Sequence, residues 1–429
     1  MQFLDYVHAC CLVGVVAYLW KREPPRLLLS PLTLLGFFVL YGVGTIVYFS
    51  DGDAVQDVRD TVSLCLILMW ICLILGMELA RATLPRLTDL STRNVRAWSR
   101  LPLQDTDTNN QLLAAVGIVV TLFMLTMFLA MGKPGQILSF FSMDSVREKQ
   151  QFRFEHGGQG GYLYQMLLVC IAPFLSFLLL LKGVRTRSRS LLLIAIALAL
   201  ILLAAKVGTF QKIIWVVYLL QLVIVYQASR RLEFGLGRVL ALLVVLLVGA
   251  AAAAFVALPD LEFGRITEWL AYRIFEVNDE VVYQTFYVYP DHLPHTWGMN
   301  IGLVHAIFGS GELTSSYVQV ANFFGAENAT FDAFYIADAW VDFSFAGVIA
   351  MSLMVGFVVK AVDVYATSLG KSAIAVALLA SGMYGLFELM VTSAFTAFLS
   401  GGLVFIPLLV MLSDGLVADL THRRAQWQR

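Results

Sequence analysis

The stretch SLLLIAIALALILLAAK at residues 190–206 carries no charged side chain before Lys206. An α-helix needs about 20 apolar residues to cross the hydrocarbon core of a bilayer. Eleven apolar runs of about this length can be marked, at about 3–20, 28–49, 61–80, 112–131, 162–181, 190–206, 209–227, 239–258, 343–360, 373–397 and 401–418. The sequence therefore predicts an all-α, polytopic integral membrane protein with about eleven transmembrane helices.

The composition agrees with a membrane location. Hydrophobic residues make up 59% of the chain, charged residues make up 14%, and the mean hydropathy is +0.78. A soluble domain is nearer a quarter charged. The net charge of −1 does not indicate a nucleic-acid partner, because the charges fall in separate loops between the apolar runs. We therefore expect membrane lipid, and not nucleic acid, around this chain.

The basic residues predict the orientation. With eleven spans the loops alternate between two sides, and 20 of the 29 Lys and Arg residues fall on one side. Cytoplasmic loops carry an excess of Lys and Arg. The N-terminus is therefore expected outside the membrane and the C-terminus in the cytoplasm.

This orientation divides the chain into three parts. Residues 1–258 form a membrane bundle of eight spans with an outer loop at 133–161. Residues 259–342 form one large extracytoplasmic segment, and residues 343–429 hold the last three spans and a short cytoplasmic tail. Because a membrane protein with one large soluble segment usually does its chemistry there, we expect the functional groups in the outer segments.

The outer run Glu262–Glu280 has the pattern of an amphipathic helix. At about 100° per residue, Arg265 and Arg273 fall on one polar face beside an apolar stripe. Guanidinium groups bind phosphate through paired, charge-assisted hydrogen bonds, so these two arginines are candidates for an anion clamp. Ion pairs within the helix to neighbouring glutamates are the alternative.

The outer loop at 133–161 carries a second set of cations. Arg147, Lys149 and Arg153 lie among phenylalanines, an arrangement that suits a lipid-linked phosphate with an anionic head and an apolar tail. Attraction of a loop helix to lipid headgroups is the alternative. Lys206 follows an apolar run and precedes a turn at Gly208, where it can face a cavity or extend to the membrane boundary.

The end of the large segment supplies candidate bases. Tyr335, Asp338 and Asp342 follow an i, i+3, i+7 spacing and share one face of a helix that leads into the ninth span. A carboxylate on that face, or His295, can take the proton of a sugar hydroxyl. Acidic residues at a helix start can instead stabilise the helix dipole. The pair Asp51 and Asp53 is too weak a pattern to predict a metal, and we expect neither metal nor cofactor.

Several local motifs resemble one known family. They are the turn Lys206-Val-Gly-Thr-Phe-Gln-Lys212, the pair Trp297-Gly298, Asn322, and the run AFYIADAWVDFSFAG at 333–347. Together with the layout of spans and the long outer segment before the last three, they resemble the Wzy-type oligosaccharide repeat-unit polymerases of bacterial inner membranes, which are GT-C-like glycosyltransferases. Ser344 and Ala346 depart from that pattern where the family carries Phe-Gly.

The resemblance implies a reaction on the periplasmic face. A glycan on undecaprenyl diphosphate is transferred to a sugar hydroxyl of a second lipid-linked repeat unit, without metal or nucleotide sugar. Asp338, His295 and Arg273 would be the catalytic residues, and Arg265, Arg147, Arg153, Lys206 and Tyr335 would join Arg273 in binding the diphosphate and substrate. A chain-length regulator and a flippase of the same pathway would be partners.

Two other functions remain open. An O-antigen ligase, or another polyprenyl-phosphate-dependent glycosyltransferase, would use the same substrates, although His305-Ala-Ile-Phe-Gly309 matches the ligase pattern poorly. A transporter of a lipid-linked or anionic glycan would carry polar residues through its spans. Here the spans are mostly apolar, and Glu388 is the main exception.

Overall fold

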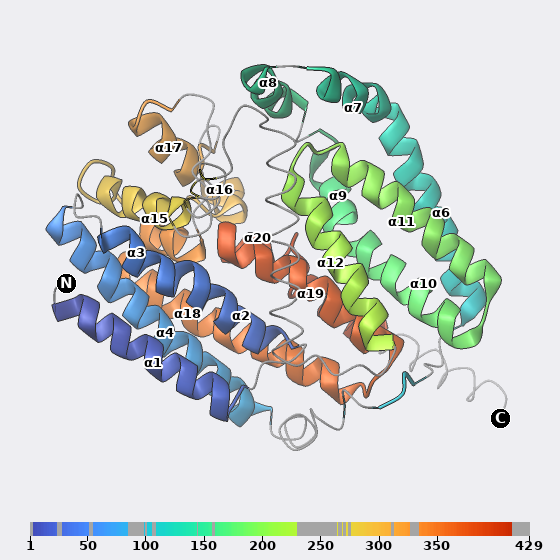
Figure 1. Cartoon of the computed structure of the whole chain (residues 1–429), viewed down its shortest axis with the longest axis horizontal. Coiled ribbons are helices and arrows are strands. Elements are labelled where there is room, and N and C mark those ends of the chain that lie inside the picture. The colour runs from blue at the N-terminus through green and yellow to red at the C-terminus, as the bar shows by residue number, and fades with distance from the viewer. Residues whose placement is uncertain are drawn as a thin grey trace. The chain divides into compact units, whose positions relative to one another are not determined.

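The computed structural model of the chain describes residues 3–23, 28–50, 55–84, 98, 101–104, 109–143, 145–156, 159–229, 264, 268, 272, 276–309, 313–326 and 334–413. Every regular element in these ranges is a helix, and strand-type pairing is limited to an isolated bridge between Gln104 and Ser372. The predicted all-α class is therefore confirmed for the described part of the chain (Figure 1).

Eight helices within the described ranges are long and apolar enough to cross a membrane. They correspond to eight of the predicted spans, and α12 (Lys212–Ser229) has a shorter apolar part at Ile214–Ser229 that corresponds to a ninth. The predicted span at 239–258 lies outside the described residues, and the one at 401–418 is described only to residue 413, so the count of eleven stays a prediction. The chain is a membrane-embedded helical protein.

The chain forms two compact units, each of which is described by itself. Unit 1 comprises Met1–Pro85, Glu233–Ala361 and Phe387–Phe395, and unit 2 comprises Arg86–Leu232, Val362–Leu386 and Thr396–Arg429. The predicted division at residues 258 and 342 is a division along the chain, whereas the units group segments that are far apart in sequence.

In its described residues, unit 1 contains three long helices and several short ones. Its elements are α1 (Phe3–Lys21), α2 (Leu29–Phe37), the π-helix η1 (Phe38–Val43), α3 (Gly44–Ser50), α4 (Gln56–Thr83), α15 (Val277–Val288), α16 (Gly302–Phe308), α17 (Ser316–Phe323) and the part of α18 (Tyr335–Ser368) that ends at Ala361. Glu276 is a turn residue and α15 begins at Val277, so the helical run predicted at 262–280 is divided there.

Two glycines bring α4 and α18 into backbone contact. A Cβ atom on Gly76 would collide with the carbonyl oxygen of Leu353, and one on Gly356 would collide with that of Leu73. Small residues allow helices in a membrane to approach closely, where packing replaces the hydrophobic effect as the source of association. This crossing fixes the position of α18 against α4.

The two ends of unit 1 carry different polar contacts. At one end Arg59 of α4 pairs with Asp5 of α1 at 2.6 Å, and the backbone N–H of Val55 donates to the Tyr283 hydroxyl of α15 at 2.8 Å. At the other end Arg81 and Lys360 both pair with Glu23. Arg59 therefore lies near the start of α4 and Arg81 near its end. Which side is cytoplasmic stays a prediction.

Unit 2 is a bundle of helices with a pair of short helices after its first long one. Its elements are α6 (Asn110–Ala130), α7 (Lys133–Ser142), α8 (Val146–His156), α9 (Gly161–Met166), the π-helix η2 (Leu167–Ile171), α10 (Ala172–Thr186), α11 (Arg189–Val207), α12, most of α19 (Ala373–Val391), the end of α20 (Ala394–Phe398) and a helix at 405–413. Asn109 caps α6 by accepting from the N–H of Gln111 at 2.9 Å.

A buried carboxyl group in unit 1 leads to a prediction about pH. The Thr45 hydroxyl lies 2.7 Å from the Tyr41 carbonyl oxygen and also contacts Oδ1 of Asp279. The single hydroxyl hydrogen of Thr45 is shared between these two acceptors, so it stabilises a carboxylate at Asp279 only weakly. Oδ2 of Asp279 is buried with no hydrogen-bond partner among the described residues, which a neutral acid tolerates better than a carboxylate. Burial raises the pKa of Asp279 well above its ordinary value, and the Thr45 hydrogen bond lowers it only in part.

We therefore expect Asp279→Asn to stabilise the protein more at alkaline than at acidic pH. A raised folded-state pKa stabilises the fold fully below the unfolded-state pKa, and this contribution is lost as pH rises through the folded-state pKa. The loss reaches about 1.4 kcal/mol per pH unit for one proton. Asparagine cannot ionise, so the melting temperature of the variant should lie above wild type by an amount that grows from pH 5 to pH 9. A constant difference across that range would contradict the assignment.

Candidate functional site

The candidate site begins at a break in α18. Phe343 has φ −139° and ψ 18°, and Ser344 has φ 54° and ψ −144°, so the helix is interrupted between Asp342 and Phe345. A non-glycine residue held in such a region costs about 1–3 kcal/mol and persists only where its surroundings fix it. Gly347, one turn later, would carry its Cβ into the Ala339 carbonyl oxygen, so the chain on both sides of the break is closely packed.

A turn at residues 296–300 docks on this break through Asp342. Oδ1 of Asp342 accepts from the Thr296 hydroxyl, from the N–H of Gly298 at 3.2 Å and from the N–H of Asn300 at 3.3 Å. The N–H of Trp297 donates to the Asp342 carbonyl oxygen at 3.0 Å. Asp342 is buried. Its side chain and its backbone carbonyl oxygen both accept hydrogen bonds from the turn, so this residue attaches the turn to α18.

Asp338 lies one helical turn before Asp342 and belongs to the same network. Its Oδ1 accepts from the Asn300 amide at 3.0 Å and from the Ser316 hydroxyl at 2.8 Å. Ser316, at the start of α17, also donates its N–H to the side-chain Oδ1 of Asn300 at 3.0 Å. Asp338 is half-buried, whereas Ser316 is buried. Asn300 therefore joins both carboxylates, the turn and α17 into one rigid arrangement.

His295 is attached to the same turn in a defined tautomer. Its Nδ1 lies 3.2 Å from the carbonyl oxygen of Val341. A carbonyl oxygen can only accept, so Nδ1 carries the hydrogen and Nε2 of the neutral ring keeps its lone pair. The ring lies edge to face with Trp297 and Trp340, at centroid distances of 6.3 and 5.6 Å. A half-buried imidazole with a fixed tautomer can act as a proton acceptor.

Tyr289 is buried next to this network. Its hydroxyl donates to Oε1 of Gln319 at 3.0 Å, and its carbonyl oxygen accepts from the Trp340 indole N–H at 2.9 Å. Burial, with the negative charges of Asp338 and Asp342, raises the pKa of Tyr289 to about 12. Tyr289 therefore stays neutral at physiological pH and serves as a hydrogen-bond donor.

The structure brings together two of the predicted site residues of unit 1. Asp338 and His295 meet around the turn at 296–300. Tyr335 does not reach this turn: it is 1% exposed, and its hydroxyl donates to Ser352 at 3.2 Å within the core. Arg265 and Arg273, predicted to clamp phosphate, lie outside the described residues.

The other predicted cations belong to unit 2. Arg153 is an exposed residue of α8, Arg147 belongs to the same helix with its side chain outside the described part, and Lys149 is half-buried. Lys206 is 1% exposed, with its ammonium 5.4 Å from the ring centre of Tyr218 and 5.5 Å from that of Tyr384. It therefore lies among aromatic rings inside unit 2. Whether these cations join Asp338 in one site stays a prediction.

Lys133 organises the outer loop of unit 2, which sequence reasoning did not anticipate. It begins α7 and donates to the carbonyl oxygen of His156, the last residue of α8, at 2.6 Å. A cation at a helix C-terminus is favourable. Burial lowers the pKa of the Lys133 ammonium below its ordinary value. This hydrogen bond thus attaches α8, the helix that carries Arg147 and Arg153, to the start of α7.

Sequence reasoning missed Thr296, Asn300 and Ser316, and gave Asp342 no anchoring role. The available signal was the turn composition around Gly298 and Asn300, since Gly and Asn favour tight turns. A metal centre has no support among the described residues, where no group of three or more His, Cys, Asp and Glu side chains gathers. Asp51 and Asp53 lie outside that part of the chain.

Comparisons with family models, with characterised proteins and with solved structures found no match to this chain.

Proposed function

We propose that the chain is a membrane glycosyltransferase that polymerises oligosaccharide repeat units linked to undecaprenyl diphosphate. The observation that carries this proposal is the arrangement of Asp338, His295 and Asn300 around an ordered turn where α18 begins. A carboxylate held by neutral donors and an imidazole held by a backbone carbonyl oxygen, at the end of an apolar bundle, suit a reaction between a water-soluble glycan and its lipid carrier.

The proposed glycosyl transfer requires one general base and a cationic site for the diphosphate. The acceptor hydroxyl oxygen attacks the anomeric carbon of the donor glycan, the bond from that carbon to the diphosphate oxygen breaks, and undecaprenyl diphosphate leaves with the electron pair. Nε2 of His295 or the Asp338 carboxylate takes the hydroxyl proton. Arg265, Arg273, Arg147 and Arg153 are the groups we propose to stabilise the charge on the diphosphate, with Lys206 as a further cation.

This function sets the location of the protein. We propose that it lies in a bacterial inner membrane with its N-terminus and the segment 259–342 in the periplasm and its C-terminus in the cytoplasm. The membrane-spanning character of α1, α4 and α18 supports a multi-pass protein. A flippase that supplies the lipid-linked unit and a regulator of chain length are the partners that such a reaction would need.

The test is a strain that lacks this chain, complemented with variants and analysed by gel electrophoresis of surface polysaccharide. The deletion should leave glycolipid with a single repeat unit. Asp338→Asn keeps a hydrogen-bond acceptor but weakens the base, and His295→Gln removes the imidazole, so the variant that removes the true base should reduce polymer by about 10²–10⁴-fold. Asp291→Asn and His292→Gln change exposed residues of the same segment and should restore long polymer.

Other outcomes identify the rival functions. Long polymer that stays on undecaprenyl diphosphate in the deletion strain would indicate a ligase. Single units confined to the cytoplasmic leaflet would indicate a transporter. Full polymer in both Asp338→Asn and His295→Gln would contradict the proposed site.

A further inference from the structure

Trp297 is exposed in a backbone conformation that a tryptophan rarely adopts. It is 71% exposed and has φ 52°, and Gly298 after it has φ 87°. The cost of this left-handed conformation is not offset by burial of the indole. Strained residues that surrounding contacts hold in place are concentrated at functional sites.

Two hydrogen bonds to Asp342 and the nearby ring of Phe343 restrict the backbone at Trp297 and Gly298. Its N–H donates to the Asp342 carbonyl oxygen at 3.0 Å, and the next N–H, of Gly298, donates to Oδ1 of the same residue at 3.2 Å. A Cβ atom on Gly298 would lie 2.9 Å from Cζ of Phe343, so this turn accepts no larger residue without movement of that ring. The fold thus presents one indole outward at a fixed position.

Polar groups lie beside this indole. His295 lies edge to face with it, and Asn300, three residues later, binds both Asp342 and Asp338. A pyranose ring has an apolar face of C–H groups and a rim of hydroxyls. An exposed indole matches that face, and histidine, amide and carboxylate groups beside it match the rim. A lipid chain could cover the indole, but it has no hydroxyl groups to match the polar groups beside it.

A second exposed tryptophan provides the contrast. Trp20 is 76% exposed, but it lies in the regular helix α1 and precedes the exposed cations Lys21 and Arg22. Tryptophan beside basic residues at a span end is typical of the membrane interface. Trp20 has no positive φ and no carboxylate network to hold it, so exposure alone does not account for Trp297.

We propose that Trp297 is a stacking platform for a pyranose ring of the acceptor glycan. This inference rests on the proposed function, because it places the acceptor hydroxyl beside His295 and Asp338. Asp342 acts as a positioning residue that holds the platform. The ligand class is a neutral or weakly charged hexose of the repeat unit, bound through its C–H face and its hydroxyl rim.

The probe for binding is the repeat-unit oligosaccharide, released by mild acid from glycolipid of the deletion strain. We expect Trp297→Ala in lipid nanodiscs to raise its Kd at least about tenfold, and Trp297→Phe, which keeps a flat ring, to raise it about threefold or less. Trp20→Ala should bind it as wild type does. Unchanged Kd in Trp297→Ala would overturn the proposal.

A second measurement uses the protein without the alanine substitution, so its outcome does not depend on whether Trp297→Ala folds. With 5-fluorotryptophan incorporated, the fluorine resonance missing from Trp297→Phe identifies Trp297, and the one missing from Trp20→Phe identifies Trp20. The oligosaccharide should shift the Trp297 signal and leave the Trp20 signal in place, while spin-labelled lipid should broaden Trp20 more than Trp297. A Trp297 signal that lipid broadens and sugar does not shift would overturn the platform and assign Trp297 to the membrane interface.

The outcomes also separate this inference from the proposed function. Binding with the predicted pattern, together with wild-type polymer in the deletion strain, would retain the platform and reject the polymerase. Polymerisation by Trp297→Ala at the wild-type KM for glycolipid would retain the polymerase and reject the platform.

Discussion

The Asp342→Ala protein should lose at least about 100-fold in polymer formation, whereas Asp342→Asn should keep most of the wild-type rate. Alanine removes the acceptor for the Thr296 hydroxyl and for the N–H groups of Gly298 and Asn300. Each buried donor left without a partner costs about 1–3 kcal/mol, so the turn should move away from α18. Asparagine keeps an oxygen at the same place, because the role proposed for Asp342 is geometric and does not require a charge.

Two measurements check this prediction. Polymer formation from extracted glycolipid in nanodiscs gives the rate, and limited proteolysis of the purified protein reports the turn at 296–300 independently of any activity. Asp342→Ala should be cleaved there faster than wild type, and Asp342→Asn should not. The opposite pattern, with Asp342→Asn as inactive as Asp342→Ala but equally resistant to protease, would make Asp342 a proton-transfer group.

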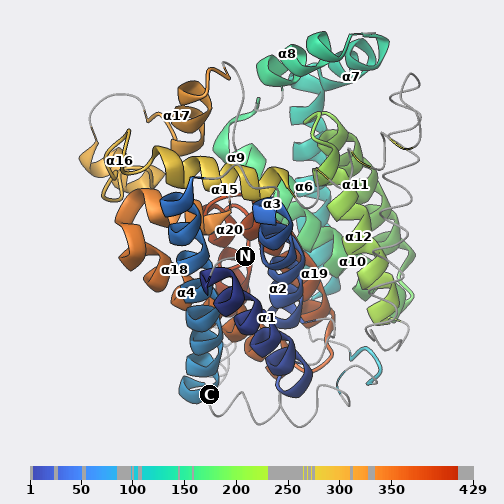
Figure 2. The ribbon, with the colours of Figure 1, turned by 60° about the vertical axis from the view of Figure 1, so that its left-hand side comes forward.

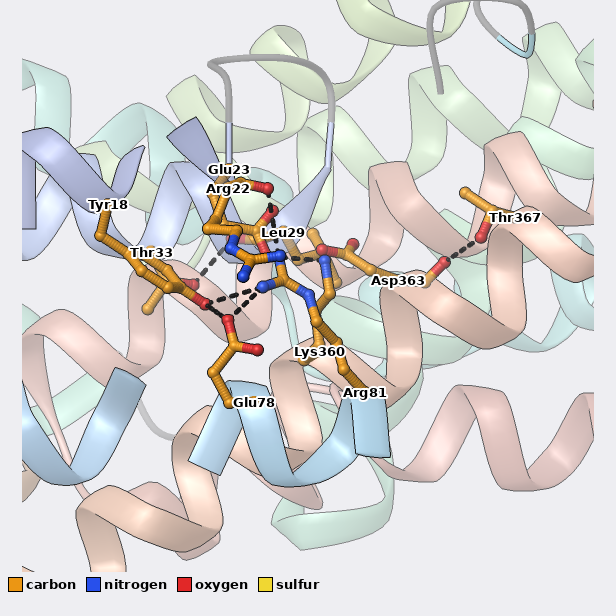
Figure 3. Close-up of polar contacts among 10 residues, drawn as sticks. All are labelled: Tyr18, Arg22, Glu23, Leu29, Thr33, Glu78, Arg81, Lys360, Asp363 and Thr367. Atoms are coloured by element: carbon orange, nitrogen blue, oxygen red, sulfur yellow. Dashed lines mark hydrogen bonds and ion pairs between the residues drawn. The ribbon is translucent and has the colours of Figure 1, made fainter. Parts of the chain in front are cut away.

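The Glu23→Gln protein should be less stable than wild type by about 3–5 kcal/mol, because two buried cations lose their shared partner. Oε1 of Glu23 contacts the Lys360 ammonium at 2.6 Å and the Arg81 guanidinium, and the side chains of Glu23, Lys360 and Arg81 are 3%, 5% and 10% exposed. Figure 3 shows these groups together with Glu78 and Tyr18, whose hydroxyl donates to Glu78 at 2.7 Å. Removal of one partner from a buried ion pair leaves a charge that water cannot reach.

The controls come from the same network. Glu78 also pairs with Arg81, but its side chain is 40% exposed, so Glu78→Gln should change the melting temperature of the detergent-purified protein only slightly. The double variant Glu23→Gln with Lys360→Met should melt above Glu23→Gln alone, because it removes the ammonium that has lost its carboxylate partner, whereas Arg81 keeps Glu78. A double variant that melts at the temperature expected from independent losses would show that Glu23 and Lys360 do not act as a pair.

The long helices were predictable from the sequence because one physical property decides them. Apolar runs such as 112–131 and 190–206 correspond to α6 and α11 to within a few residues. Hydropathy cannot place irregularities inside a span. The π-helices η1 and η2 contain no residue pattern that distinguishes them from α-helix.

The site was predictable in part. The i, i+3, i+7 spacing placed Asp338 and Asp342 correctly on one side of a helix, and His295 was named for its chemistry. Tyr335 shared that spacing but turns into the core, because Phe37 and Phe334 pack around it with ring centroids 5.7 and 5.4 Å away. Neither residue at the interruption, Phe343 or Ser344, is a proline or glycine, so the local sequence does not predict a break in the helix there. The break accompanies the docking of a turn more than 40 residues earlier, and such a long-range contact cannot be predicted from neighbouring residues.

Figure 2 shows α15, α16 and α17 near the start of α18, at the end of unit 1 opposite the Glu23 contacts. The close approach at Gly76 and Gly356 lies between these ends, where a Cβ atom on either glycine would meet a backbone carbonyl oxygen of the other helix. A larger residue at either position would push α4 and α18 apart, and the start of α18, which carries Asp338, would move with its helix. Exposed residues of α4 such as Leu75 and Leu79, which are 54% and 52% exposed, can change without that effect. Related sequences should therefore vary at these exposed leucines more readily than at the two glycines.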